Sequence, residues 1–262
     1  MKSFDGTRIN LRRIGSGPPL VVVPGTLAPS VRYEALARIL SADHQVVLVE
    51  RRGYGKSCVG VGPCRTDFQV QDLVAVLALL DETAIVFGHS FGGVVALAAR
   101  PSAGHAMKSL VLYEPPVAML GGELVDLLER CRSMVEAGRP EEAVRLSLAL
   151  GGASPAQCEA ATRQLAWKMR ALAPGLISDL ECVTSMTIGD LKVDTWLDSA
   201  PDPPVALIES GLSDRRYTES VHLLKALIPA ARHRFLPHED HFFRDVESLA
   251  ALIREEGAQA SL

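Results

Sequence analysis

The stretch Ile85-Val86-Phe87-Gly88-His89-Ser90-Phe91-Gly92-Gly93 decides the fold of this chain. Its first residues form a short apolar run typical of a buried strand, and the residues that follow it are apolar like the start of a buried helix. Such a sharp reversal from strand to helix leaves no room for side chains at Gly88 and Gly92 and forces Ser90 into strained backbone geometry. Strain of this kind costs roughly 1–3 kcal/mol and persists mainly at functional sites. Ser90 is therefore the candidate nucleophile.

A serine hydroxyl is a weak nucleophile at neutral pH, so Ser90 requires a histidine base and a carboxylate that orients the base. The later part of the chain offers both groups. After an apolar strand at 204–208, the loop 209–214 ends in Asp214, and the loop 237–243 before the last expected helix contains His241. We predict Asp214 as the acid and His241 as the base.

Two alternatives stay open. Glu114 ends the expected strand at 108–113 and is the alternative acid, although it can also be interpreted as a loop carboxylate bonded to the backbone. His238 lies three residues before His241 in the same loop and is the alternative base. The remaining histidines are interpreted as loop, strand or helix residues: His44, His89, His105, His222 and His233.

The chain resembles the α/β-hydrolase family in the order Ser90, Asp214, His241 and in its alternating strands and helices. The segment 50–57, Glu-Arg-Arg-Gly-Tyr-Gly-Lys-Ser, looks like the arginine- and glycine-rich loop of that family. The resemblance covers nearly the whole chain. It implies an α/β fold with a mostly parallel central sheet of about eight strands flanked by helices, and a base just before the last helix. Some members of the family supply the acid from the position of Glu114.

The same resemblance implies an oxyanion hole made of two backbone amides. One is the amide of Phe91, directly after the nucleophile, and the other is that of Thr26, in the loop after the strand at 20–23. The family usually has His-Gly where this chain has Pro24-Gly25. Because the usual histidine helps to hold the loop and proline has no amide hydrogen, the geometry of this loop is left open.

An insertion interrupts the expected core domain, which comprises residues 1–116 and 201–262. Residues 117–200 are far longer than an ordinary connection, and helical spacing recurs at 121–137, 140–150, 155–172 and 175–186. We predict a helical cap, or lid, over the triad. Apolar cap residues are candidates to line its pocket and suggest a small or medium hydrophobic substrate: Met119, Leu120, Trp167, Met169, Met186 and Trp196.

Composition excludes several function classes. The 262 residues carry a formal net charge of -4, and no basic patch stands out, so nucleic acid is not an expected partner. Arginine pairs such as Arg51-Arg52 are interpreted as solvated or turn-stabilising, and the alternative for this pair is that it faces an anionic substrate. The polar start of the chain and the shortness of its apolar runs predict no membrane association.

The five cysteines are scattered and lack the spacing of a zinc or redox motif. We therefore expect no cofactor and no metal, reduced thiols, and a cytoplasmic location. The expected partners are a small-molecule substrate and, at most, a second copy in a homodimer.

These features predict a serine hydrolase that cleaves an ester, thioester, lactone or amide through an acyl-enzyme, most simply a carboxylic ester hydrolase. Epoxide hydrolases and dehalogenases are disfavoured, because those relatives have aspartate at the position of Ser90. One alternative is a nonhydrolytic reaction on the same scaffold, such as acyl transfer, cyclisation, lyase or perhydrolase chemistry. A second alternative is a noncatalytic protein that binds a ligand in the cavity.

Overall fold

The computed structural model describes residues 1–262 apart from 63, 166–168, 193–202 and 260–262, and it leaves out the side chains of 161–169. In the described chain one sheet has seven strands, where about eight were expected, in the order β1-β3-β2-β4-β5-β6-β7. β1 pairs antiparallel with β3, and all other neighbours are parallel. The strands are β1 (Asn10–Ile14), β2 (Pro19–Val23), β3 (Gln45–Glu50), β4 (Ala84–His89), β5 (Met107–Tyr113), β6 (Val205–Ser210) and β7 (Arg232–Leu236).

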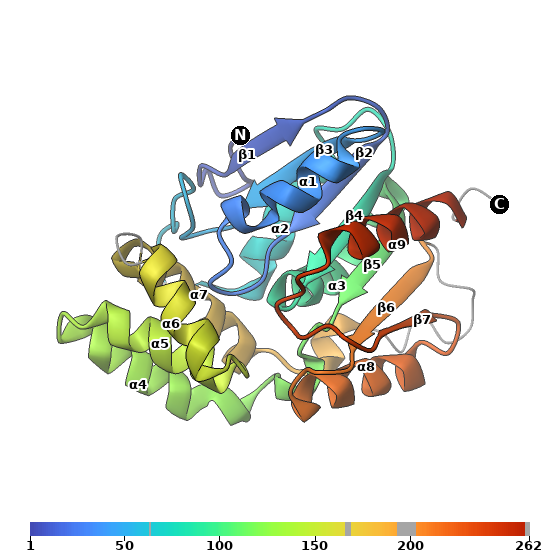
Figure 1. Ribbon diagram of the computed structural model, residues 1–262. Helices are drawn as coiled ribbons and strands as arrows, with labels where there is room; N and C mark the ends of the chain where they lie inside the picture. The colour runs from blue at the N-terminus through green and yellow to red at the C-terminus, as the bar shows by residue number, and fades with distance from the viewer. Residues whose placement is uncertain (63, 166–168, 193–202, 260–262) are drawn as a thin grey trace.

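Helices cover both faces of the sheet (Figure 1). On one face, α1 (Glu34–Leu40) and α9 (Val246–Gln259) contribute to one apolar core. On the other face, α2 (Thr66–Leu77), α3 (Phe91–Ala103) and α8 (Arg215–Leu227) contribute to a second core. Because the central strands are buried on both faces, they are continuously apolar, and all five residues of β2 are buried.

Among the described residues between β5 and β6, four α-helices occur: α4 (Val125–Glu136), α5 (Pro140–Leu150), α6 (Pro155–Leu165) and α7 (Met169–Ser185). They form a separate group beside the sheet (Figure 1). A third apolar cluster holds this group to the rest of the molecule, since it combines residues of α4, α5 and α7 with Leu27 and Tyr54 from loops of the sheet domain. The inserted helices therefore pack onto the loops at one end of the sheet.

One expected helix boundary is wrong. The expected helical segments 155–172 and 175–186 place a break at Pro174, but α7 runs through this residue and Gly175. Gly175 lies against the ring of Tyr54, so closely that an added Cβ would lie 2.6 Å from ring atoms, and it also faces Gly53. The proline and glycine therefore mark the contact between α7 and the loop after β3, where the helix needs a bare backbone, and tertiary packing overrides the usual breaking effect of proline.

The turn between β4 and α3 has the predicted strained geometry. Ser90 has φ 54° and ψ −128°, which few residues other than glycine adopt. A Cβ at Gly88 would lie 2.7 Å from the Cα of Gly93, and one at Gly92 would overlap the carbonyl oxygens of Val23 and Pro24. The steric requirement for glycine on both sides of the serine is confirmed.

We expect Gly92→Ala to destabilise the protein by about 3 kcal/mol or more, because rigid backbone atoms and not flexible side chains occupy the space of the new methyl group. Thermal unfolding followed by circular dichroism measures this as a fall in Tm. The matched control is Gly122→Ala, since no heavy atom lies within 4 Å of a Cβ there. An equal Tm for both variants would contradict the packing argument.

Candidate active site

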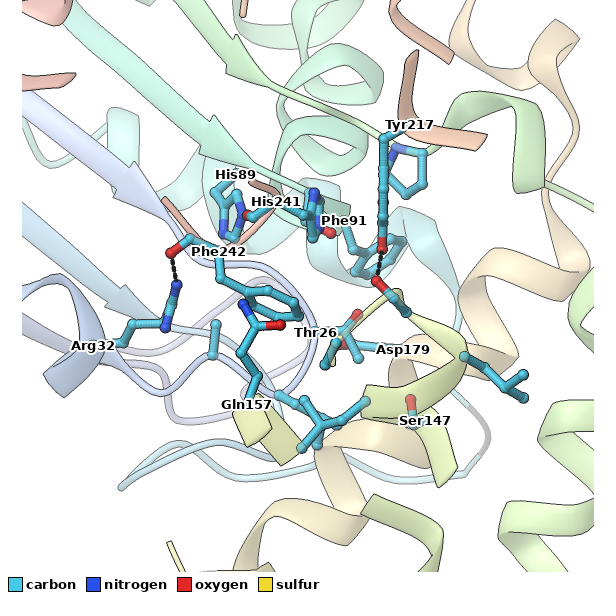
Figure 2. A pocket seen from close by; sticks show the side chains of 18 of the residues that line it. Thr26, Arg32, His89, Phe91, Ser147, Gln157, Asp179, Tyr217, His241 and Phe242 are labelled. Carbon is cyan, nitrogen blue, oxygen red and sulfur yellow. Dashed lines mark hydrogen bonds between the residues drawn. The ribbon is translucent and has the colours of Figure 1, made fainter. Parts of the chain in front are cut away.

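A cavity of about 860 Å³ brings together the predicted site residues Thr26, Ser90, Phe91 and His241. Thr26 follows β2, Ser90 and Phe91 lie between β4 and α3, and His241 lies in the loop between β7 and α9. These loops meet at the carboxyl ends of parallel strands, where ligands of open α/β sheets bind. Figure 2 shows the cavity with the side chains of His241, Phe91 and Thr26.

His241 is held by Glu114. The Nδ1 atom of His241 donates a hydrogen bond to Oε2 of Glu114 over 2.8 Å, and both side chains are buried. Glu114 also accepts from the backbone amide of Ser210 and the hydroxyl of Ser213, each at 2.8 Å. When Glu114 is ionised, its carboxylate is therefore fixed by three donors, and the other ring nitrogen of His241 is left for the cavity.

The prediction that Asp214 orients His241 is wrong in this structure. Asp214 is the N-cap of α8, and its Oδ1 accepts from the backbone amide and from Nε of Arg216. After β6 the chain turns, as the amide of Ser213 donates to the carbonyl of Ser210, while the amides of Gly211 and Leu212 donate to Leu236 and Glu239. This turn brings the hydroxyl of Ser213 to Glu114 and leaves Asp214 at the start of the next helix. The alternative acid, Glu114, takes the position instead.

The alternative base, His238, lies exposed and is absent from the described wall of the cavity. His241 is buried, which is the main cause that lowers its pKa to about 3, and the charge of Arg32 acts in the same direction. The imidazole is therefore neutral at pH 7 and able to accept a proton. One face of it is covered by the ring of Tyr217, whose centroid lies 3.6 Å away at an interplanar angle of 12°.

His89 has structural partners on both ring nitrogens. The hydroxyl of Tyr33 donates to its Nδ1 over 2.7 Å, and its Nε2 donates to the carbonyl of His241 over 2.8 Å. The amide of Gly25 donates in turn to the hydroxyl of Tyr33. Burial holds the pKa of His89 well below its usual range, so the ring is neutral in this chain of bonds. His89 thus connects the loop after β2 to the loop that carries His241.

A buried arginine holds the loop that contains Pro24. Arg51 donates to the carbonyl oxygens of Pro24 and Gly25 at 2.6 and 2.8 Å. The same guanidinium forms a two-pronged ion pair with Asp179 of α7, at 2.6 and 2.7 Å. The hydroxyl of Tyr54 also donates to Asp179 and accepts from the amide of Leu27. The amides of Thr26 and Phe91 have no acceptor among the described residues, so both are free to bind a ligand oxygen.

Both members of the Arg51-Arg52 pair are buried, which corrects their interpretation as solvated or substrate-facing. Arg52 pairs with Asp72 through two bonds of 2.6 and 2.8 Å, and with Asp5 at 2.7 Å. Opposite charges, which favour the charged form, outweigh burial, so the pKa of each arginine stays above its ordinary value.

Several residues that line the cavity were not predicted from the sequence, notably Arg32, Gln157, Asp179 and Tyr217. Only tertiary contacts bring these residues to the cavity. Tyr217 alone lies near a predicted site residue in the sequence, three residues after Asp214. Of the apolar candidates, Met119 lines the described wall, while Leu120 and Met186 are absent from it. Trp167, Trp196 and the side chain of Met169 lie outside the described residues.

In the part of the chain that the structure describes, no group of three or more His, Cys, Asp or Glu side chains is placed to hold a metal ion. The five cysteines are free thiols. No helix among the described residues is long and apolar enough to cross a membrane.

The family model that matches residues 20–255 is that of the "Alpha/beta hydrolase family". Among solved structures, an alpha/beta hydrolase from Sphaerobacter thermophilus is similar with a TM-score of 0.80 and 26% identity, over 98% of either chain. An esterase from Exiguobacterium antarcticum has a TM-score of 0.79 at 18% identity, covering 97% of this chain and 98% of the esterase.

Among curated proteins, a putative carbamate hydrolase, RutD, from Azorhizobium caulinodans is 26% identical to this chain. The alignment covers 82% of this chain and 88% of RutD. Two further matches are partial. The alignments cover 5% of the polyketide synthase ThaQ of Burkholderia thailandensis and 40% of a putative non-heme haloperoxidase of Mycobacterium phage D29.

The burial of Glu114 predicts how the stability of the folded protein depends on pH. Burial raises its pKa from 4.5 to about 7, so between these values the folded state binds more protons than the unfolded state. Stability present below pH 4.5 is therefore lost as the pH rises to about 7. Glu114→Gln does not titrate, so its stability relative to the unaltered protein should increase over this range, by at most about 3 kcal/mol.

Urea unfolding at about pH 5 and about pH 8 measures this difference. Asp214→Asn is the control, because Arg216 lowers the pKa of the Asp214 carboxyl. The stability that this ionised carboxylate contributes is therefore lost only in more acidic solution. Its stability difference should be constant over the same range. A constant difference for Glu114→Gln as well would contradict the buried, proton-binding state of Glu114.

Proposed function

Because the chain belongs to the alpha/beta hydrolase family, we propose that it is a serine hydrolase with a triad of Ser90, His241 and Glu114. The observation that carries the proposal is the buried hydrogen bond of 2.8 Å between His241 and Glu114, in the same cavity as the strained Ser90. A carboxylate on Nδ1 fixes the tautomer that leaves Nε2 unprotonated, as a general base requires.

In the proposed reaction, the hydroxyl oxygen of Ser90 attacks the carbonyl carbon of the substrate while Nε2 of His241 takes the hydroxyl proton. The imidazolium that forms is stabilised by Glu114 and then gives its proton to the leaving group, so that the acyl group stays on Ser90. Water attacks the acyl-enzyme with His241 again as base, which releases the acid and restores the serine.

The negative oxygen of each tetrahedral intermediate would be bound by the amides of Thr26 and Phe91. Such donors contribute most when they are fixed before the reaction, and removal of one costs roughly 2.7–4 kcal/mol in a well-studied case. Arg51 fixes the loop of Thr26 through the carbonyls of Pro24 and Gly25. In this chain arginine thus performs the holding role that histidine has elsewhere in the family.

The proposed substrates are esters, thioesters, lactones or amides of small to medium size, and the helices α4–α7 are proposed to act as the cap. Support comes from the cavity wall, where apolar side chains of the inserted helices, including Leu127, Leu148 and Val183, line the same cavity as the loops of the sheet domain. The curated relative that aligns over 88% of its length is also named as a hydrolase, a putative carbamate hydrolase.

A fluorophosphonate probe tests the proposal by labelling an activated serine. We expect labelling of the intact protein, none of Ser90→Ala, and labelling slowed about a thousandfold or more in His241→Ala and Glu114→Gln. Asp214→Asn, the matched carboxylate control, should label within about twofold of the normal rate, because Asp214 contacts Arg216 and not His241. If Asp214→Asn were slow and Glu114→Gln fast, the acid would be misassigned. A folded protein that does not label would favour nonhydrolytic chemistry or ligand binding.

The support of the oxyanion loop is testable through Asp179→Asn. Loss of the negative charge that holds Arg51 should displace the Pro24–Thr26 loop and lower kcat about tenfold or more, with a smaller change in KM. The control is Asp72→Asn, which breaks the neighbouring buried pair with Arg52 away from the cavity. It should reduce stability comparably and leave kcat within about twofold. Equal kcat in both variants would remove Asp179 from any role in positioning the loop.

A further inference from the structure

Basic side chains outnumber acidic side chains on the described wall of the cavity. The described wall includes three arginines, Arg32, Arg216 and Arg244, and a single carboxylate, Asp179. Asp179 is fully buried and already bound by Arg51. The described wall therefore carries more basic than acidic side chains.

Two of the three arginines are neutralised by neighbouring carboxylates. Nε of Arg216 lies 2.8 Å from Asp214, and Nη2 of Arg244 lies 2.9 Å from Asp240. Arg32 has no carboxylate partner among the residues that the structure describes. Its charge is therefore available to a ligand.

The guanidinium of Arg32 is held in place by a backbone carbonyl and two aromatic rings, without a carboxylate. It donates through Nη2 to the carbonyl of Phe242, and it lies 5.7 Å from the ring centroid of Phe242 and 5.2 Å from that of Phe243. A guanidinium has five N–H donors and stacks readily on aromatic rings, so an edge with unused donors remains. Stacking also limits the rotamer freedom that would otherwise be lost on binding.

Arg32 lies close to the proposed chemistry. Its partner Phe242 directly follows His241, and Figure 2 shows Arg32 hydrogen-bonded to Phe242 on the wall that also carries His241. The positive charge also contributes to the lowered pKa of His241, which reflects the same proximity. Because Arg32 and Ser90 line the same cavity, one substrate held there can contact both residues.

We propose that Arg32 binds a carboxylate of the substrate, so that the enzyme prefers short esters, thioesters, lactones or amides that carry a second, ionised acid group. The planar donor edge matches a carboxylate, and a single unpaired arginine suits one negative charge better than the two of a phosphate. The apolar side chains of the wall would contact the carbon chain between the two ends. This inference rests on the proposed hydrolase function.

The test compares two esters of similar length, 4-nitrophenyl hydrogen glutarate and 4-nitrophenyl hexanoate, by the ratio of their kcat/KM values. We expect the unaltered protein to prefer the charged ester. In Arg32→Gln the ratio should fall about tenfold or more, mainly through a higher KM for the charged ester, and in Arg32→Lys it should fall less. Added salt should lower the ratio in the unaltered protein. The control is Arg38→Gln, which removes the same charge from the exposed outer side of α1 and should keep the ratio.

An unchanged ratio in Arg32→Gln, or a preference for the neutral ester, would overturn the role of Arg32 while leaving the hydrolase intact. If neither ester reacts but the fluorophosphonate probe labels Ser90, a second measurement tests the role of Arg32. It compares how well glutarate and hexanamide slow the labelling of Ser90. Protection by glutarate that is lost in Arg32→Gln supports the proposal, and equal protection in both proteins overturns it. If Ser90 is not labelled at all, the proposed function itself fails, and the inference fails with it.

Discussion

The ion pair between Arg51 and Asp179 is the interaction on which the arrangement of the cavity depends. Arg51 lies in the loop after β3, whereas Asp179 belongs to α7 of the inserted helices, so the pair joins two parts of the chain 128 residues apart. The same guanidinium holds two carbonyls of the loop after β2. A charge pair buried this deeply is stable only with further hydrogen bonds, which Gln69 and Tyr54 provide to Asp179. The inserted helices and the oxyanion loop are therefore positioned by one group.

The histidine loop is fixed by a second set of buried bonds. Glu114 holds the ring of His241, and His89 holds its backbone carbonyl. Since Tyr33 links His89 to Gly25, the loop after β2 is tied to the histidine loop as well as to α7. Proline at position 24 is tolerated here because the loop is held through its carbonyls and through the amide of Gly25, and none of these bonds requires an amide hydrogen at residue 24.

Expectations from the sequence succeeded where the cause is local and failed where the cause lies in the packing of distant segments. The turn at Ser90 follows from glycines within three residues of it, and the parallel sheet follows from short apolar runs that alternate with helices. The acid was misassigned because both Glu114 and Asp214 end or follow strands that lie side by side. Their separation along the chain does not reveal which one meets His241. The break expected at Pro174 failed because the packing of Tyr54 against Gly175 keeps α7 continuous.

The sequence by itself determined the α/β fold and the position of Ser90, because short-range sterics and strand order set these features. The choice of His241 as the base followed from the resemblance to the α/β-hydrolase family, which places its base just before the last helix. Tertiary structure alone decided that Glu114 contacts His241, that Arg51 is buried against Asp179, and that Arg32 faces the cavity without a carboxylate partner in the described chain. The reason is physical. Each of these depends on charges and hydrogen-bond donors from segments far apart in the chain, which are matched only when the sheet and the inserted helices pack together.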